Sequence, residues 1–251
     1  MVQIVATAKV MEAPVTRLPT LARPSALPAL VLADGTLEGL KWLGVVLMTV
    51  DHVDKYLLHE SVPVMFAFGR LALPLFGFVL AYNLARPKAR GNGTYTRTLR
   101  RLAVAGLVAT VPSIALGGLG WGWWPLNVMW MLAAAVAVMY LTERGGRGAL
   151  AAAGLAFLVI GGFVEFWWPG IALCLGAWRY CKRPSCGALA VWIGSTAALF
   201  IINRNFWALA AIPVILVATQ IRLTVPRTRF AFYVYYPAHL CAVWAIRQWL
   251  F

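Results

Sequence analysis

Residues 41–59 read KWLGVVLMTVDHVDKYLLH, an apolar run that is long enough, with its flanks, to cross a bilayer. The run nevertheless carries six ionisable side chains, which are Lys41, Asp51, His52, Asp54, Lys55 and His59. An ionisable group at membrane depth costs roughly 2.5–3.5 kcal/mol on insertion scales, so such groups usually face a protein interior and mark function. We therefore expect a buried polar stripe along this helix.

Helix geometry places several of these groups on one side. Lys41 and His52 are eleven residues apart, about three turns, so both point the same way and lie roughly 16 Å apart along the axis. Asp51 and Lys55 form an i,i+4 pair whose charges can neutralise each other. Asp51 and His52 lie deepest and are the first candidates for function. For Asp54, Lys55 and His59, an interfacial position with the charge reaching water is the simpler interpretation.

The composition of the whole chain is that of a membrane protein. Of its 251 residues 62% are hydrophobic and 12% are charged, against about 25% charged residues in soluble domains. The mean hydropathy is +0.78. Twelve Trp and eight Tyr suit the aromatic belts of a bilayer interface. The sequence therefore predicts an all-α, polytopic integral membrane helix bundle.

The net charge of +14 does not indicate a nucleic-acid partner. The basic residues sit in short clusters between apolar runs, and no nucleic-acid-binding motif accompanies them. The four cysteines form no CxxC pair and have no histidines at zinc-site spacing, so we predict no metal site and interpret them as structural.

Residues 1–35 are predicted to be a flexible cytoplasmic tail, because four prolines break any long helix there. Residues 36–251 are predicted to form a single transmembrane domain. About nine spans are expected, at 37–59, 64–84, 99–119, 125–142, 148–167, 170–181, 187–203, 205–221 and 229–250.

Lys and Arg are concentrated in alternate connections between these spans. The largest cluster follows the second span, and further clusters follow the fourth, sixth and eighth. By the positive-inside rule this pattern predicts a cytoplasmic N-terminus and an outside C-terminus. The expected location is therefore a membrane, which the chain crosses several times.

Other polar residues are expected at membrane depth. Arg70 lies near the outer end of the second span, and the short connection makes the first two spans antiparallel neighbours, so Arg70 can approach the acidic end of the first. Asn83 marks the cytoplasmic end of the second span, and Glu165 ends the fifth. His239 lies inside the last span, three residues after Tyr236. Such groups are functional candidates by default.

Three stretches resemble the TraX family of conjugative-plasmid membrane proteins, and most of all its TrbP branch. They are DGTLEGLKWLGVVLMTVDHVDKYLL at 34–58, GRLALPLFGFVLAYNLARP at 69–87 and FYVYYPAHL at 232–240. The resemblance runs from about residue 34 to the end. The DH of the first span and the YPxHL of the last are its most specific elements.

The resemblance implies a role in maturation of the conjugative pilin subunit, with N-terminal acetylation as the associated activity and acetyl-CoA as donor. It also implies a polar core of Asp51, His52 and His239, with Arg70 and Tyr236 as helpers. More distantly, the chain is similar to membrane acyltransferases whose first helix carries Arg-x10-His. Here that pattern is Lys41-x10-His52, and lysine cannot make the bidentate contacts of arginine.

Acetyl transfer to an amine assigns roles to these residues. His52 is the expected general base, since imidazole titrates near neutral pH. Asp51 or Asp54 would orient the catalytic groups or bind the ammonium, and Arg70 or His239 would stabilise the oxyanion. The phosphates of the donor need cations, for which the best candidates are Arg97, Arg100 and Arg101, supported by Arg86 and Lys88. Lys41, Lys55, Asn83, Tyr236 and Glu165 complete the expected binding residues.

Three other interpretations remain open at this stage. TrbP-type proteins occur with pilins matured by head-to-tail cyclisation, so the chain could process peptide bonds instead. It could also be a non-catalytic pilin chaperone. A proton-coupled transporter uses the same buried acids and histidines, but the sequence shows no repeat that favours it. The oligomeric state is not predicted.

Overall fold

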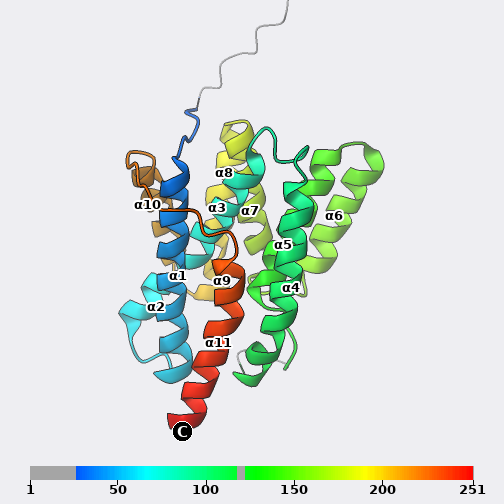
Figure 1. Cartoon of the computed structure of the whole chain (residues 1–251). Coiled ribbons are helices and arrows are strands. Elements are labelled where there is room, and N and C mark those ends of the chain that lie inside the picture. The colour runs from blue at the N-terminus through cyan, green and yellow to red at the C-terminus, as the bar shows by residue number, and fades with distance from the viewer. Residues whose placement is uncertain (1–26, 118–121, 251) are drawn as a thin grey trace, which may run out of the picture.

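The computed structural model describes residues 27–117 and 122–250, and within these ranges the chain is helical with no strand. One isolated bridge joins Leu126 and Val164, in two connections between helices. The prediction of an all-α bundle is therefore confirmed. In Figure 1 most helices run roughly parallel or antiparallel to one another, as in the helix bundles of membrane proteins.

Helices lie over each of the predicted apolar segments. Their bounds are α1 Asp34–Leu57, α2 Pro63–Gly69, α3 Ala72–Ala85, α4 Thr94–Ala115, α5 Val128–Arg144, α6 Arg147–Gly161, α7 Trp167–Lys182, α8 Cys186–Ala198, α9 Phe200–Asn203, α10 Ala211–Ala218 and α11 Ala231–Leu250. A single 3₁₀ turn, η1 at Trp207–Ala210, precedes α10.

Three helical stretches are long and apolar enough to cross a membrane: Pro63–Ala85, Thr94–Ala115 and Cys186–Asn203. Two of them join consecutive helices, α2 with α3 and α8 with α9. The 24 residues of α1 give sufficient length, but its charged side chains set it apart from these three. The chain is thus consistent with a membrane protein, while nine crossings and a cytoplasmic N-terminus remain predictions.

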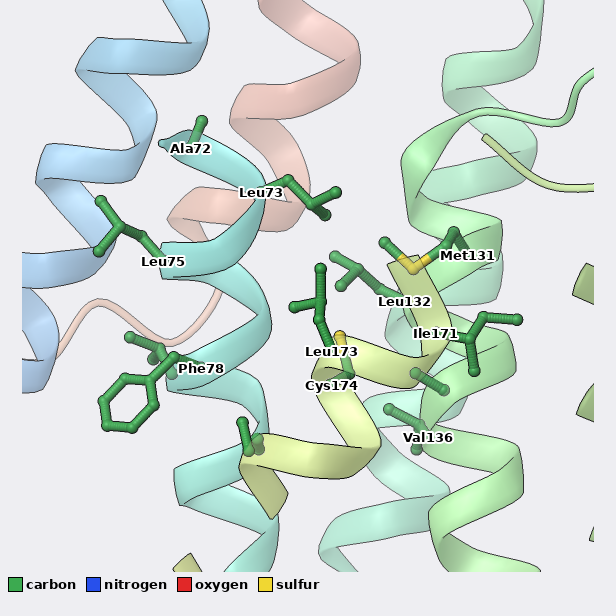
Figure 2. Close-up of a cluster of buried hydrophobic side chains, with 14 of the residues drawn as sticks. Ala72, Leu73, Leu75, Phe78, Met131, Leu132, Val136, Ile171, Leu173 and Cys174 are labelled. Carbon is green, nitrogen blue, oxygen red and sulfur yellow. The ribbon is translucent and has the colours of Figure 1, made fainter. Parts of the chain in front are cut away.

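The core lies where α3, α5 and α7 meet. Figure 2 shows Leu73 of α3, Leu132 of α5 and Leu173 of α7 together between these helices. Helix association in lipid depends on close packing rather than on the hydrophobic effect, so small residues matter at such contacts. A Cβ on Gly77 would lie 2.7 Å from Cδ1 of Leu173 and 3.0 Å from Sγ of Cys174, so α3 and α7 approach closely because this residue is glycine.

The connections divide between the two ends of the bundle. We call one end the basic end; it holds the connections at 86–93, 145–146, 183–185 and 219–230, at the top of Figure 1. The opposite end holds the connections at 58–62, 162–166 and 204–206. This division follows the alternation of basic clusters in the sequence.

The last described residues of the predicted tail pack on the bundle. Leu32 is buried, and its backbone N–H donates to the Tyr82 hydroxyl at 3.0 Å. The Tyr180 hydroxyl donates to the carbonyl of Pro28 at 2.9 Å. Most of the predicted tail, residues 1–26, lies outside the described residues.

An extended segment at residues 221–230, which we call the strap, leads from α10 to α11. It crosses the start of α1, where Leu223 N donates to Thr36 Oγ1 at 3.2 Å and Thr228 N donates to Glu38 Oε1 at 3.0 Å. A Cβ on Gly35 would overlap the Leu223 carbonyl, so the crossing requires glycine. Because of the strap, α11 starts well below the start of α1 in Figure 1.

Candidate functional site

Two histidines, one from α1 and one from α11, form the centre of the site. Nδ1 of His52 lies 2.6 Å from Nε2 of His239, and the two rings are nearly parallel, at 8°. The predicted convergence of the first and last helices is therefore present in the structure. His239 is 7% exposed, so this contact is shielded from solvent.

The backbone fixes the direction of the protons in this pair. Nδ1 of His239 lies 3.1 Å from the carbonyl oxygen of Tyr235, which can only accept, so His239 Nδ1 carries a proton and donates. In the neutral ring, His239 Nε2 is then an acceptor, and His52 Nδ1 must donate to it. His52 Nε2 is left with its lone pair, and this atom can accept a proton from a substrate.

A buried ion pair lies beside the histidines. A terminal nitrogen of Arg70 pairs with Oδ1 of Asp51, and the other terminal nitrogen donates to Asn203 Oδ1 at 3.3 Å. The Arg70 guanidinium also lies 4.4 Å from the centre of the Phe66 ring. The expected approach of Arg70 to the first helix is thus made to Asp51. Arg70, rather than Lys55, is the ion-pair partner of Asp51.

Glycine makes room for this pair. Gly69 ends α2 next to Arg70, and a Cβ at this position would overlap Oδ1, Cβ and Cγ of Asp51. The close approach of α2 to α1 therefore depends on the missing side chain. No pattern in the sequence singled out Gly69.

Asp54, expected to orient catalytic groups or bind the ammonium, is held in the turn between α1 and α2. Its side chain is 1% exposed, and Oδ1 accepts a hydrogen bond from Val62 N at 3.0 Å, which closes the turn between α1 and α2. Its backbone carbonyl also accepts from Glu60 N at 2.9 Å. Asp54 lines neither of the two cavities of the site.

A large cavity of about 1050 Å³ opens at the basic end. Its lining includes seven cationic side chains and no carboxylate: Lys41, Arg86, Lys88, Arg97, Arg101, Arg227 and Arg229. Asn83, near the end of α3, also lines it. The large cavity is thus a strongly positive compartment that reaches from the basic end into the bundle.

The structure changes the predicted set of cations in two ways. Arg100 is exposed and is not part of the lining, although its neighbour Arg101 is. Arg227 and Arg229, which the sequence pattern presented only as a topology signal, enter the lining from the strap. Lys41 forms an ion pair with Glu38 at 2.5 Å, and its ammonium lies 4.4 Å from the centre of the Phe232 ring.

At the basic end, Arg86 also pairs with Asp34 at the first turn of α1. The hydrogen bond from the guanidinium lowers the pKa of the Asp34 carboxyl below its usual value. This exposed pair ties α1 to the end of α3, at the mouth of the large cavity.

A small cavity of about 120 Å³ lies on the other side of the histidine pair. Its polar lining consists of Asp51, His52, Lys55, Glu60, Arg70, Glu165, Asn203 and Tyr236. Glu60 is exposed in the connection between α1 and α2, so this cavity reaches the surface at the end opposite the basic one. The predicted residues Lys55 and Glu165 are therefore brought together with the histidine of α1.

Four side chains line both cavities, and we call them the partition: Met48, Phe76, Val128 and Tyr236. They come from α1, α3, α5 and α11. The partition separates the positive compartment from the small one, and His52 lies on the small-cavity side of it. No sequence signal marked Met48, Phe76 or Val128, because each is an ordinary apolar residue of a membrane helix.

Within the described part of the chain, the donor set does not indicate a metal centre. Among residues 27–117 and 122–250, no three His, Cys, Asp or Glu side chains are grouped to hold an ion. The small cavity brings together an imidazole that can transfer protons and two cations, Arg70 and Lys55, that can stabilise negative charge.

Comparison with known proteins identifies a family. The sequence model of a family described as "TraX: TraX protein" matches residues 36–247, which is most of the chain. No curated protein and no solved structure matches the chain.

Proposed function

The chain belongs to the TraX family, which gives it a role in conjugative pilin processing, and we propose that this role is acetyl transfer to the N-terminal amine of the pilin subunit. The proposal makes the protein a membrane-bound N-acyltransferase of the bacterial inner membrane, with acetyl-CoA as donor. One observation carries it: the free imidazole nitrogen of His52 lies beside a partition between a wide cationic cavity and a small polar one.

The large cavity fits the donor. Acetyl-CoA supplies the acetyl group as a thioester, and its phosphates need several cations, which hold phosphate oxygens by charge-assisted hydrogen bonds. Lys41, Arg97, Arg101, Arg227 and Arg229 line the cavity and provide that charge. A carboxylate-free lining also excludes the repulsion that an acid would impose on a polyanion.

The histidine pair performs the proton transfer. An α-ammonium ordinarily has a pKa of about 7.7–8.0, so it must lose a proton before it can attack a carbonyl carbon. His52 Nε2 accepts this first proton, and the neutral amine then attacks the thioester carbon. The C–N bond forms as the C–S bond breaks, and the second proton of the nitrogen passes to the leaving thiolate, which departs as a thiol. His239 holds His52 in the tautomer that keeps Nε2 free. A general base of this kind contributes roughly 10²- to 10⁴-fold to the rate.

Arg70 stabilises the charge that develops on the carbonyl oxygen. It lines the small cavity, where a cation is worth more than in water because the site is shielded. Asp51 holds the guanidinium in place through the ion pair. His239 is not assigned to the oxyanion, because both of its ring nitrogens are already engaged with His52 and Tyr235.

Intact-mass measurement of mature pilin, made with and without this protein, tests the proposal. Acetyl transfer predicts that pilin gains the mass of one acetyl group only when the protein is present, and that His52→Ala abolishes the gain. Loss of one water would instead show head-to-tail cyclisation. An unchanged pilin mass would contradict both enzymatic functions and leave a chaperone.

A further inference from the structure

The two cavities differ sharply in charge. The lining of the large cavity carries seven cations and no acid, whereas the small cavity is lined by three carboxylates and two cations, which leaves one negative charge in excess. A protonated amine is repelled by the first compartment and attracted by the second. The amine substrate therefore belongs in the small cavity.

Glu165 is the carboxylate best placed to receive it. Asp51 is neutralised by Arg70, but none of the ion pairs within 4.0 Å among the described residues uses Glu165. Glu165 and His52 line the same cavity, so an ammonium attracted by the carboxylate meets the free Nε2 of His52 there. The cavity thus holds both an attractor for the cation and the base that deprotonates it.

The volume of the small cavity limits what can accompany the amine. A cavity of about 150 Å³ lined by apolar side chains holds one benzene molecule. At about 120 Å³, the small cavity is smaller than that, and part of it must hold the amine and the first backbone atoms. What remains of this volume suits a small side chain better than a branched or aromatic one.

We propose that the small cavity is the acceptor subsite, that it takes the N-terminal ammonium of a polypeptide, and that it admits only chains whose first residue is glycine or alanine. This inference rests on the proposed function and adds its substrate selectivity. The polypeptide enters from the end opposite the basic one, where Glu60 brings the cavity to the surface.

The test uses the full-length protein and its pilin in cells. Pilin is made with its own first residue and with Gly, Ala, Val, Leu or Phe at that position, and the acetylated fraction of mature pilin is read by intact mass. Gly and Ala are expected to be acetylated. Acetylation of pilin that begins with Leu or Phe should fall by at least roughly 10- to 200-fold. A single methylene too many in a fitted pocket already has an effect of this size.

Two wall variants test whether this cavity sets the limit. Leu199 is 1% exposed and lines the small cavity, so Leu199→Ala is expected to extend acetylation to Val and Leu. Ala72 lines the same cavity, so Ala72→Val is expected to reject Ala while Gly is still acetylated. Leu155→Ala is the matched control, because Leu155 is 64% exposed on α6 and lines neither cavity.

The outcomes separate the inference from the function it rests on. Equal acetylation from Gly to Phe, with pilin of the native first residue also acetylated, would overturn the inference and leave the proposed function intact. Unchanged selectivity in Leu199→Ala and Ala72→Val would have the same meaning. Absence of acetylation on every pilin, including the native one, would overturn both.

Discussion

His52 and His239 are joined by a 2.6 Å contact between Nδ1 and Nε2, although the two residues are 187 positions apart in the chain. The contact locks α1 to α11 and orders the protons from His52 through His239 to a backbone carbonyl. The proposed chemistry therefore depends on two helices that come from opposite ends of the described chain.

The two histidines should differ in their effects on catalysis. His52→Ala removes the base and is expected to lower single-turnover acetylation by roughly 10²- to 10⁴-fold. His239→Ala keeps the base but no longer fixes the tautomer of His52. It should therefore lower the acetylation rate less than His52→Ala does, and it should change the pH profile of the residual activity. His59→Asn removes an imidazole that lines neither cavity and is the matched control. Equal rates for His52→Ala and the parent protein would contradict the assignment.

The Asp51–Arg70 pair is expected to contribute strongly to stability. The two side chains are 15% and 14% exposed, and removing one partner of a buried pair costs about 3–5 kcal/mol. Asp51→Asn should therefore lower the free energy of unfolding, measured in detergent, by about that amount. The double variant Asp51→Asn with Arg70→Met should recover part of the loss, because no unpaired charge is left. Additive losses in this cycle would show that the two side chains do not interact.

A single methyl group at Gly69 should damage the same pair. Gly69→Ala places a Cβ on top of Asp51, so we expect the ion pair to be displaced and acetylation to fall at least as far as in Asp51→Asn. Gly154→Ala on α6 is the matched control, since a Cβ there meets nothing within 4 Å. In a helix interior such a change usually stabilises by about 1 kcal/mol. Similar behaviour of the two alanine variants would show that α1 and α2 are less tightly packed than the structure indicates.

Variants of two adjacent arginines can distinguish a role in donor binding from a role in membrane topology. Arg101 lines the large cavity and Arg100 does not. Arg101→Gln is expected to raise the KM for acetyl-CoA, and the loss of one phosphate contact, typically about 1.5–3 kcal/mol for a hydrogen bond to a charged group, corresponds to roughly 10- to 150-fold. Arg100→Gln should leave the KM nearly unchanged. Steady-state kinetics with varied acetyl-CoA checks both values, and an equal effect of the two changes would exclude the cavity as the donor site.

The rarity of ionisable residues at membrane depth allowed much of the site to be predicted. Asp51, His52 and His239 were identifiable because each is an ionisable residue within an apolar helix. The short connection after α1 indicated that Arg70 could approach Asp51. The i,i+4 spacing of Asp51 and Lys55 was a weaker guide. That spacing predicts contacts within an isolated helix. In the folded protein Arg70, which follows α2, is the ion-pair partner of Asp51.

Other parts of the site depend on tertiary structure that the sequence does not reveal. Arg227 and Arg229 reach the large cavity only because the strap turns across α1, guided by Gly35 and by hydrogen bonds to Thr36 and Glu38. The sequence showed a cluster of basic residues in the strap but not the course of the strap across α1.

Neighbours within one helix present a similar difficulty. Successive residues differ by about 100° around the axis, so of two adjacent arginines one can face the cavity while the other faces away. The rotation of α4 about its own axis decides between Arg100 and Arg101, and packing sets that rotation.

The partition has a consequence for the cell that houses this protein. Two cavities that open at opposite ends of a membrane bundle would form a water-filled leak if they joined, and protons would run through it down their gradient. Met48, Phe76, Val128 and Tyr236 keep them apart with apolar and aromatic bulk. A bundle of this kind can therefore open toward both aqueous phases while the membrane around it keeps its proton gradient.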